Sequence, residues 1–175
     1  MEFTEGSYFA RPRGVARRGA VFVDVPILYP PPQGLIHVWL NADGTLGRQD
    51  FETAYRTSDD EARRRGFLVL ARAKPRPVIL LAPIERADPK ATTWVLPIYS
   101  VAEEEPSGPN IFRLPPAPGF GLGHEHYADI YRTSGVPLPY LRPDRYRCDL
   151  TREARLELIW HLWQCLGLTL RRPTR

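Results

Sequence analysis

The chain has 175 residues, of which 43% are hydrophobic, and its formal net charge is +4. This length suits one domain, and the apolar fraction is high enough for a buried core, which excludes a disordered chain. Nineteen prolines and thirteen glycines favour a loop-rich, mainly β protein over a helix bundle, while two cysteines are too few for a disulfide framework.

No apolar run of the sequence approaches the ~20 residues that a membrane-spanning helix needs. The first residues also lack the charged and apolar regions of a signal peptide. We therefore expect a cytoplasmic protein with no membrane partner.

Arginine supplies all of the 24 basic residues except Lys74 and Lys90. An arginine can bind a phosphate with two parallel hydrogen bonds and can stack on a base, which a lysine cannot do. The positive balance favours a nucleic acid or an acidic protein as a partner. A genome whose base composition enriches arginine is the alternative explanation.

The first segment, residues 1–17, is predicted to be a basic, flexible arm. Its arginines cluster where Pro12 and Gly14 oppose regular structure. Such a segment either seeks nucleic acid or forms a weakly ordered, solvated end. A short basic tail is expected at the other terminus, over residues 171–175.

The remaining chain, residues 18–170, is predicted to be a single domain that opens with a strand over 20–25. An ordered insertion over 26–73 is expected between this strand and the next one. Within the insertion, a proline-rich break precedes a strand over 35–40, and a short helix follows with Ser58 as its N-cap.

The strands after the insertion carry the first candidate functional residue. Pro77 restricts Arg76 to an extended backbone, so the guanidinium can be presented at the mouth of a strand over 78–84 with little loss of entropy. An antiparallel strand over 92–98 returns beside it, and a short strand over 111–114 follows.

A strand over 127–132 and a helix over 151–167 complete the predicted elements. Thr151 is the expected N-cap of the helix. The apolar residues that recur at helical spacing are predicted to face the core, and they are Leu156, Ile159, Trp163 and Leu166, with Leu158, Leu162 and Cys165 widening the stripe.

The order of these strands resembles the MazF/PemK/Kid family of toxin ribonucleases. A basic residue and a glycine open the first strand, Arg76-Pro77 opens the second, and the third ends at Tyr99-Ser100. In addition, Asp-Ile-Tyr-Arg-Thr at 129–133 is similar to the Asp-x-x-Arg-Thr stretch of the Kid/PemK branch, and the final helix has the Leu-Gly-Leu ending of that family. The resemblance covers roughly residues 18–25, 74–100 and 110–168.

The resemblance implies an SH3-like small β-barrel of the mainly β (α+β) class with a C-terminal helix. It also implies a toxin of a toxin–antitoxin system, which cleaves single-stranded RNA as a metal-independent endoribonuclease. A homodimer and a cognate antitoxin protein are the expected partners besides RNA, and no cofactor or metal is expected.

The same resemblance assigns roles to Arg76 and Asp129, and residues near them in the predicted strands complete the expected site. Arg76 would bind the scissile phosphate, and Asp129 would act as the base that accepts the ribose 2′-hydroxyl proton. His126, or the hydroxyl groups of Tyr99 and Ser100, would complete the catalytic pocket. Five further residues are expected to bind the RNA around it: Arg18, Arg72, Lys74, Tyr127 and Arg132.

His126 is a candidate general acid because it lies near Asp129 in the sequence and because histidine titrates near neutrality. A metal site shared with His124 is one alternative, although two ligands are too few for zinc without distant help. A polar loop that follows a glycine-rich run is the other alternative.

Three positions depart from the family pattern. Tyr99 stands where many relatives place a threonine, and Tyr127 stands where the Kid branch has an arginine. Leu70 and Ala71 lie near the place of a His-Glu pair in that branch. Either the active site was rebuilt, or the chain is a non-catalytic module of the same fold that binds nucleic acid or a partner protein. A CcdB-like toxin that acts on a protein target is a third interpretation.

Overall fold

The computed structural model describes six stretches of the chain: residues 8–12, 16–29, 36–70, 72–82, 91–101 and 106–168. The protein is mainly β, with antiparallel strands and a C-terminal helix, and therefore belongs to the α+β class. Within these stretches no helix is both long enough and apolar enough to cross a bilayer.

The chain forms two compact units rather than the single domain predicted over 18–170. The larger unit combines Met1–Ile27 with Pro75–Arg175, and the smaller unit comprises Leu28–Lys74. The smaller unit therefore coincides closely with the segment predicted as an insertion over 26–73.

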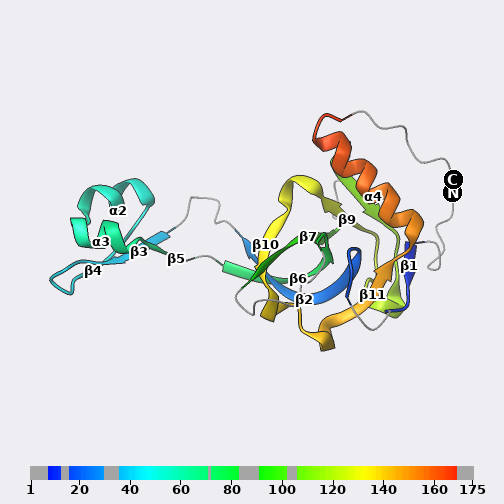
Figure 1. Cartoon of the computed structure of the whole chain (residues 1–175), viewed down its shortest axis with the longest axis horizontal. Coiled ribbons are helices and arrows are strands. Elements are labelled where there is room, and N and C mark those ends of the chain that lie inside the picture. Colours follow the sequence, from blue (N-terminus) through cyan, green and yellow to red (C-terminus); the bar gives the residue numbers. More distant parts are fainter. Residues whose placement is uncertain are drawn as a thin grey trace. The chain divides into compact units, whose positions relative to one another are not determined.

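The larger unit is built on an eight-stranded sheet with the order β1-β11-β2-β6-β7-β9-β8, in which β10 also pairs with β7 (Figure 1). Its strands are β1 (Phe9–Ala10), β2 (Ala20–Tyr29), β6 (Arg72–Leu80), β7 (Thr92–Ser100), β8 (Ile111–Leu114), β9 (His126–Asp129), β10 (Ser134–Pro137) and β11 (Tyr146–Leu150). Among the described strands, β1 and β8 end this order without pairing to each other, so the sheet is not closed into the barrel that we expected.

The N-terminal segment differs from the predicted flexible arm. Phe9 pairs with Leu150 of β11, and the side chains of Tyr8 and Phe9 are only 4% and 3% exposed. Burial of two aromatic side chains outweighs the conformational cost of ordering this short stretch. The prediction for 1–17 is therefore wrong at residues 8–10.

The strand β2 also runs further than predicted. It continues through Pro26 to Tyr29, where we expected a proline-rich break. A proline fits a strand only where its missing N–H is not needed for the ladder. Val25 and Ile27, on either side of it, are buried, and their burial accounts for the longer strand.

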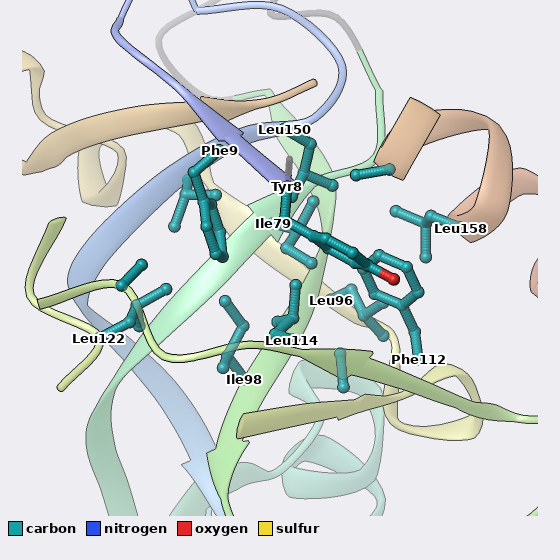
Figure 2. Packing of buried hydrophobic residues seen from close by; sticks show 14 of the residues in the cluster. Tyr8, Phe9, Ile79, Leu96, Ile98, Phe112, Leu114, Leu122, Leu150 and Leu158 are labelled. Carbon is teal, nitrogen blue, oxygen red and sulfur yellow. The ribbon is translucent and has the colours of Figure 1, made fainter. Parts of the chain in front are cut away.

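The sheet of the larger unit carries an apolar cluster on each of its faces. Alternate residues of a strand point to opposite faces, and both sets are buried along β6 and β7. Ile79 and Leu96 belong to the first cluster, which Figure 2 shows with Tyr8 and Phe112 beside them. Val78 and Leu80 belong to the second cluster, together with residues of β2, β7 and β10.

The helix α4 (Arg152–Cys165) packs against β8 and β11. As predicted, Thr151 is its N-cap, and its hydroxyl oxygen accepts a hydrogen bond from the backbone N–H of Ala154 at 3.3 Å. The buried side chains of the helix are Ala154 and Leu158.

The apolar stripe predicted to face the core does so along one edge and is exposed along the other. Leu156, Trp163 and Leu166 are 42%, 39% and 73% exposed, respectively. Leu158, Leu162 and Cys165, which were predicted to widen the stripe, pack on the first cluster together with Ala154. Two apolar stripes of similar strength lie on this helix, and helical spacing alone could not decide which one packs on the sheet.

The smaller unit is a three-stranded antiparallel sheet with two short helices. Its strands are ordered β4-β3-β5, with the bounds β3 (Ile36–Leu40), β4 (Leu46–Gln49) and β5 (Leu68–Leu70). Its helices are α2 (Phe51–Thr57), which we did not predict, and α3 (Asp60–Arg65). The carboxylates of Asp50 and Asp59 accept the capping hydrogen bonds, so the N-cap predicted at Ser58 is in fact Asp59.

Candidate nucleic-acid interface

A group of arginine and tyrosine side chains lies where β6, β7 and β9 run side by side. The guanidinium carbon of Arg76 is 4.4 Å from the ring centroid of Tyr99, and that of Arg132 is 5.2 Å from the same centroid. Tyr127 is opposite Tyr99 in the sheet register, and their rings stack at 5.5 Å with an interplanar angle of 25°. We call Arg76, Tyr99, Tyr127, Asp129 and Arg132 the tyrosine–arginine cluster.

The alternation of the strands explains why these side chains meet. Arg76 has the same parity as Val78 and Leu80, which are fully buried in the second apolar cluster. Tyr99 has the same parity as Val95 of that cluster. The tyrosine–arginine cluster is therefore the place where this face of the sheet changes from buried to half-exposed, and it is held by rigid strands.

Asp129 is fixed by three interactions. One carboxylate oxygen accepts hydrogen bonds from the side-chain amide of Asn110 at 2.7 Å and from the backbone N–H of Tyr131 at 3.1 Å. The other oxygen lies 3.4 Å from Nε of Arg132, and only 17% of the side chain is exposed. The capping bond to Tyr131 ends β9 and begins the 3-10 turn η2 (Ile130–Arg132), where we had predicted a strand through Arg132.

Tyr99 and Asp129 both favour the protonated form of Arg132. The pKa of Arg132 is raised, chiefly by a side-chain hydrogen bond with Tyr99 and further by the charge of Asp129, although burial acts in the opposite direction. Since an arginine is protonated at any physiological pH, two permanent cations contact the ring of Tyr99. Each can donate paired hydrogen bonds to a phosphate.

His126 and Ser100 lie on the other face of the sheet from Asp129 and Tyr99. They are opposite each other in the register of β9 and β7, and they share the parity of Ile98 in the first apolar cluster. His126 is 7% exposed, and its Nδ1 is 2.5 Å from the backbone carbonyl oxygen of His124. The structure therefore does not bring these two candidates together with the cluster.

The buried position of His126 predicts a pH-dependent stability. Burial lowers the pKa of its imidazole below the ordinary value of 6.5, although the hydrogen bond to His124 opposes this shift. Because the pKa is lower in the folded state, the unfolded chain takes up the proton first. This contribution to stability is complete above pH 6.5 and is lost as the pH falls toward the folded pKa.

We expect the free energy of unfolding in urea to fall as the pH is lowered from about 7.5 to about 5.5. The fall should be smaller in His126→Gln, because residue 126 does not titrate in that variant. Circular dichroism across a urea series at both pH values measures this difference. The same pH dependence in both proteins would contradict the assignment.

Three further residues were predicted to bind RNA, and they are not members of the cluster. Arg18 is exposed in the turn before β2, where it lines a groove beside α4. Arg72 and Lys74 belong to the smaller unit, in the first half of β6. The cluster itself is built from the larger unit alone.

Sequence reasoning missed Asn110, which holds the carboxylate of Asp129 from the turn that precedes β8. Its backbone carbonyl also accepts a hydrogen bond from Ile130 at 3.0 Å, so it fixes the start of η2 in two ways. An asparagine after a proline is an ordinary turn signal, and nothing in the sequence connects it to a position 19 residues away.

In comparisons with known proteins, the chain matches no protein-family model and no curated protein. Its function is therefore argued from the geometry of the cluster.

Proposed function

We propose that the tyrosine–arginine cluster binds single-stranded RNA and that the protein cleaves this RNA without a metal ion. In this proposal Arg76 and Arg132 bind one phosphate, and the tyrosine rings contact the unpaired bases beside it. Stacking on aromatic rings is available only to bases that are not enclosed in a duplex, which favours single strands.

The proposed reaction is an attack of the ribose 2′-oxygen on the adjacent phosphorus. The 2′-hydroxyl proton passes to the carboxylate of Asp129, and the bond between phosphorus and the 5′-oxygen breaks. The phenol of Tyr99 gives a proton to that leaving oxygen, and the products are a 2′,3′-cyclic phosphate and a 5′-hydroxyl. The two guanidinium groups stabilise the additional negative charge in the transition state.

The observation that carries the proposal is the contact of two guanidinium groups with one tyrosine ring, at 4.4 and 5.2 Å, on a half-exposed surface. Two cations side by side repel each other, and a bound phosphate relieves that repulsion.

Incubation of the purified protein with a mixed-sequence RNA in EDTA tests the proposal. We expect defined fragments with 2′,3′-cyclic phosphate ends, and no cleavage of the same sequence as a duplex. An intact RNA that is not shifted in a native gel would overturn both binding and cleavage.

The second candidate function is RNA binding without cleavage. It is favoured by the three interactions of Asp129, which give the carboxylate a structural role as cap of η2 and partner of Arg132. In the EDTA experiment, this function predicts a shifted but intact RNA.

Two conservative variants separate the candidates. Asp129→Asn keeps an oxygen acceptor for the cap but cannot accept the 2′-hydroxyl proton, and Tyr99→Phe keeps the ring but not the phenol. If the protein is a nuclease, we expect both variants to retain RNA binding and to lose about 10²–10⁴-fold in cleavage rate. Single-turnover cleavage of a labelled RNA measures this loss, and an unchanged rate in both variants would contradict the assigned roles.

We also propose that the protein is a toxin of the MazF/PemK type with an SH3-like sheet, silenced by a cognate antitoxin and active as a homodimer. The sequence resemblance, the antiparallel sheet and the closing helix α4 support this proposal. Expression without an antitoxin is then expected to arrest growth.

A further inference from the structure

A groove beside α4 is formed by residues that the proposed RNA site does not use. It has a volume of about 500 Å³, within the range of small-molecule sites, and lies between α4, the turn before β2 and Leu81, which follows β6. Gly19 and Leu158 belong to its lining and are both buried, so the groove reaches down to the packed interior of the larger unit.

The lining of the groove offers few hydrogen-bonding groups. Apart from three arginines, its side chains are aliphatic or aromatic. The backbone of Gly19 already donates to Leu80 and accepts from Leu150, each at 2.8 Å. A sugar or a nucleobase would lose its water in this groove without gaining partners for its polar groups, so a ligand with a hydrocarbon body fits better.

The cations of the groove have no acidic partner among the described residues. Between those residues, no ion pair involves Arg18, Arg152 or Arg155, and no acidic side chain lines the groove. Three guanidinium groups at one surface without a counter-charge favour an anionic ligand.

The charges and the apolar side chains follow each other along α4. Arg152 and Arg155 lie near the N-terminus of the helix, where its dipole also favours an anion. Leu156, Ile159 and Trp163 follow toward the C-terminus, and spacings of three and four residues place all five on one face. From Arg152 to Trp163 the helix rises about 16 Å, which is comparable to an extended dodecyl chain with its head group.

The position of Arg155 is fixed by Gly19. A Cβ at this glycine, whose φ is +90°, would lie 2.6 Å from Cδ of Arg155. The stem of the arginine therefore packs directly on the glycine backbone. Because the guanidinium is held at the wall of the groove in this way, it loses little conformational entropy when it binds an anion.

We propose that this groove binds a free fatty acid, a single-chain anionic amphiphile. Its carboxylate pairs with Arg18, Arg152 and Arg155, and its hydrocarbon chain covers Leu156 and Trp163, which are 42% and 39% exposed. A membrane surface is a poorer partner, because a flat bilayer cannot reach the floor of a groove. The proposal does not depend on the proposed action on RNA.

Calorimetric titration of the full-length protein with three dodecyl compounds tests the proposal, at concentrations below those at which they form micelles. We expect dodecanoate to bind about tenfold more tightly than the neutral dodecanol, and dodecyltrimethylammonium to bind most weakly. Decanoate should bind about tenfold more weakly than dodecanoate, because two methylene groups fewer are removed from water.

Variants of the groove complete the test. The double variant Arg152→Gln/Arg155→Gln should lose the preference for dodecanoate over dodecanol, whereas Leu156→Gln, at an exposed position, should weaken the binding of both. Arg147→Gln is the control, because it removes the same charge at an exposed position of β11 outside the groove. Circular dichroism verifies that the variants are folded.

Three results would overturn the proposal: no dodecyl compound binds, dodecanoate and dodecanol bind equally, or the double variant keeps the preference. Vesicles of phosphatidylcholine and phosphatidylglycerol supply a fourth. A protein that sediments with these vesicles but does not bind dissolved dodecanoate would have a membrane surface as its partner. In sedimentation without any ligand, a dimer that Leu156→Gln dissociates would identify a second copy as the occupant.

Discussion

Replacement of Arg76 by alanine is expected to weaken the binding of single-stranded RNA by about tenfold to a hundredfold, as the loss of one charged hydrogen-bonding partner does. Cleavage should fall further, by about 10²–10³-fold beyond the loss in affinity, because the same cation stabilises the transition state. Growth arrest on expression should disappear. Gel shifts, single-turnover cleavage and colony counts measure the three effects.

The loss should come from the phosphate contact and not from unfolding. The contact recorded for Arg76 is with the Tyr99 ring, and the arginine is half-exposed. The thermal unfolding of the Arg76→Ala protein is therefore expected to differ little from that of the wild type. The slope of log K against log salt should decrease by about 0.7, the value for one phosphate contact on a single strand.

Two further variants sharpen this experiment. Arg76→Lys keeps the charge but loses the planar group that lies on Tyr99 and the paired hydrogen bonds, so it should recover only part of the activity. Arg11→Ala removes an exposed arginine next to β1 and should behave as the wild type. Undiminished growth arrest from Arg76→Ala would rule out Arg76 as the phosphate-binding residue.

The family resemblance predicted that Arg76 and Asp129 share one site, and the antiparallel pairing of β6 with β7 explains why Arg76 lies on the ring of Tyr99. The place of His126 could not be inferred from its distance to Asp129 along the chain. Residues three apart in a strand point to opposite faces, since the side-chain period is two. Here that rule places the buried His126 on the face of the sheet that carries the first apolar cluster.

The smaller unit was less predictable for a different reason. Its helix α2 has seven residues, too few for apolar periodicity to be recognised, and its start depends on a carboxylate cap from Asp50. Its core also depends on one close contact between strands, the pair Trp39 and Gly47. A contact of this kind follows from the register and cannot be deduced from either residue alone.

Gly47→Ala is expected to destabilise the smaller unit by about 3 kcal/mol, at the upper end of the cost of overpacking. A Cβ at residue 47 would lie 2.0 and 2.1 Å from atoms of the Trp39 ring. The ring is 5% exposed and packs on Ala54, Ala62 and Phe67, so it cannot move aside without opening this core.

Hydrogen exchange resolves the effect by region. Amides of β3 and β4 should lose protection in Gly47→Ala, whereas those of β7 and β9 should keep it. Trp39→Leu makes room for the added methyl group, so the cost of Gly47→Ala should be much smaller in the Trp39→Leu background than in the wild type. Equal costs in the two backgrounds would show that the ring contact is not the cause.

Gly44→Ala is the matched control in the same unit. No atom lies within 4 Å of a Cβ at this turn residue, so the substitution should cost only the strain of its φ of +85°, about 1 kcal/mol.

Gly47→Ala also tests whether the smaller unit takes part in RNA binding. The tyrosine–arginine cluster lies within the larger unit, and Gly47→Ala should therefore bind RNA as the wild type does. If RNA binding is lost together with the protection of β3 and β4, part of the binding surface must belong to the smaller unit. Arg72 and Lys74 are then the first residues to replace, because they are basic and lie in that unit.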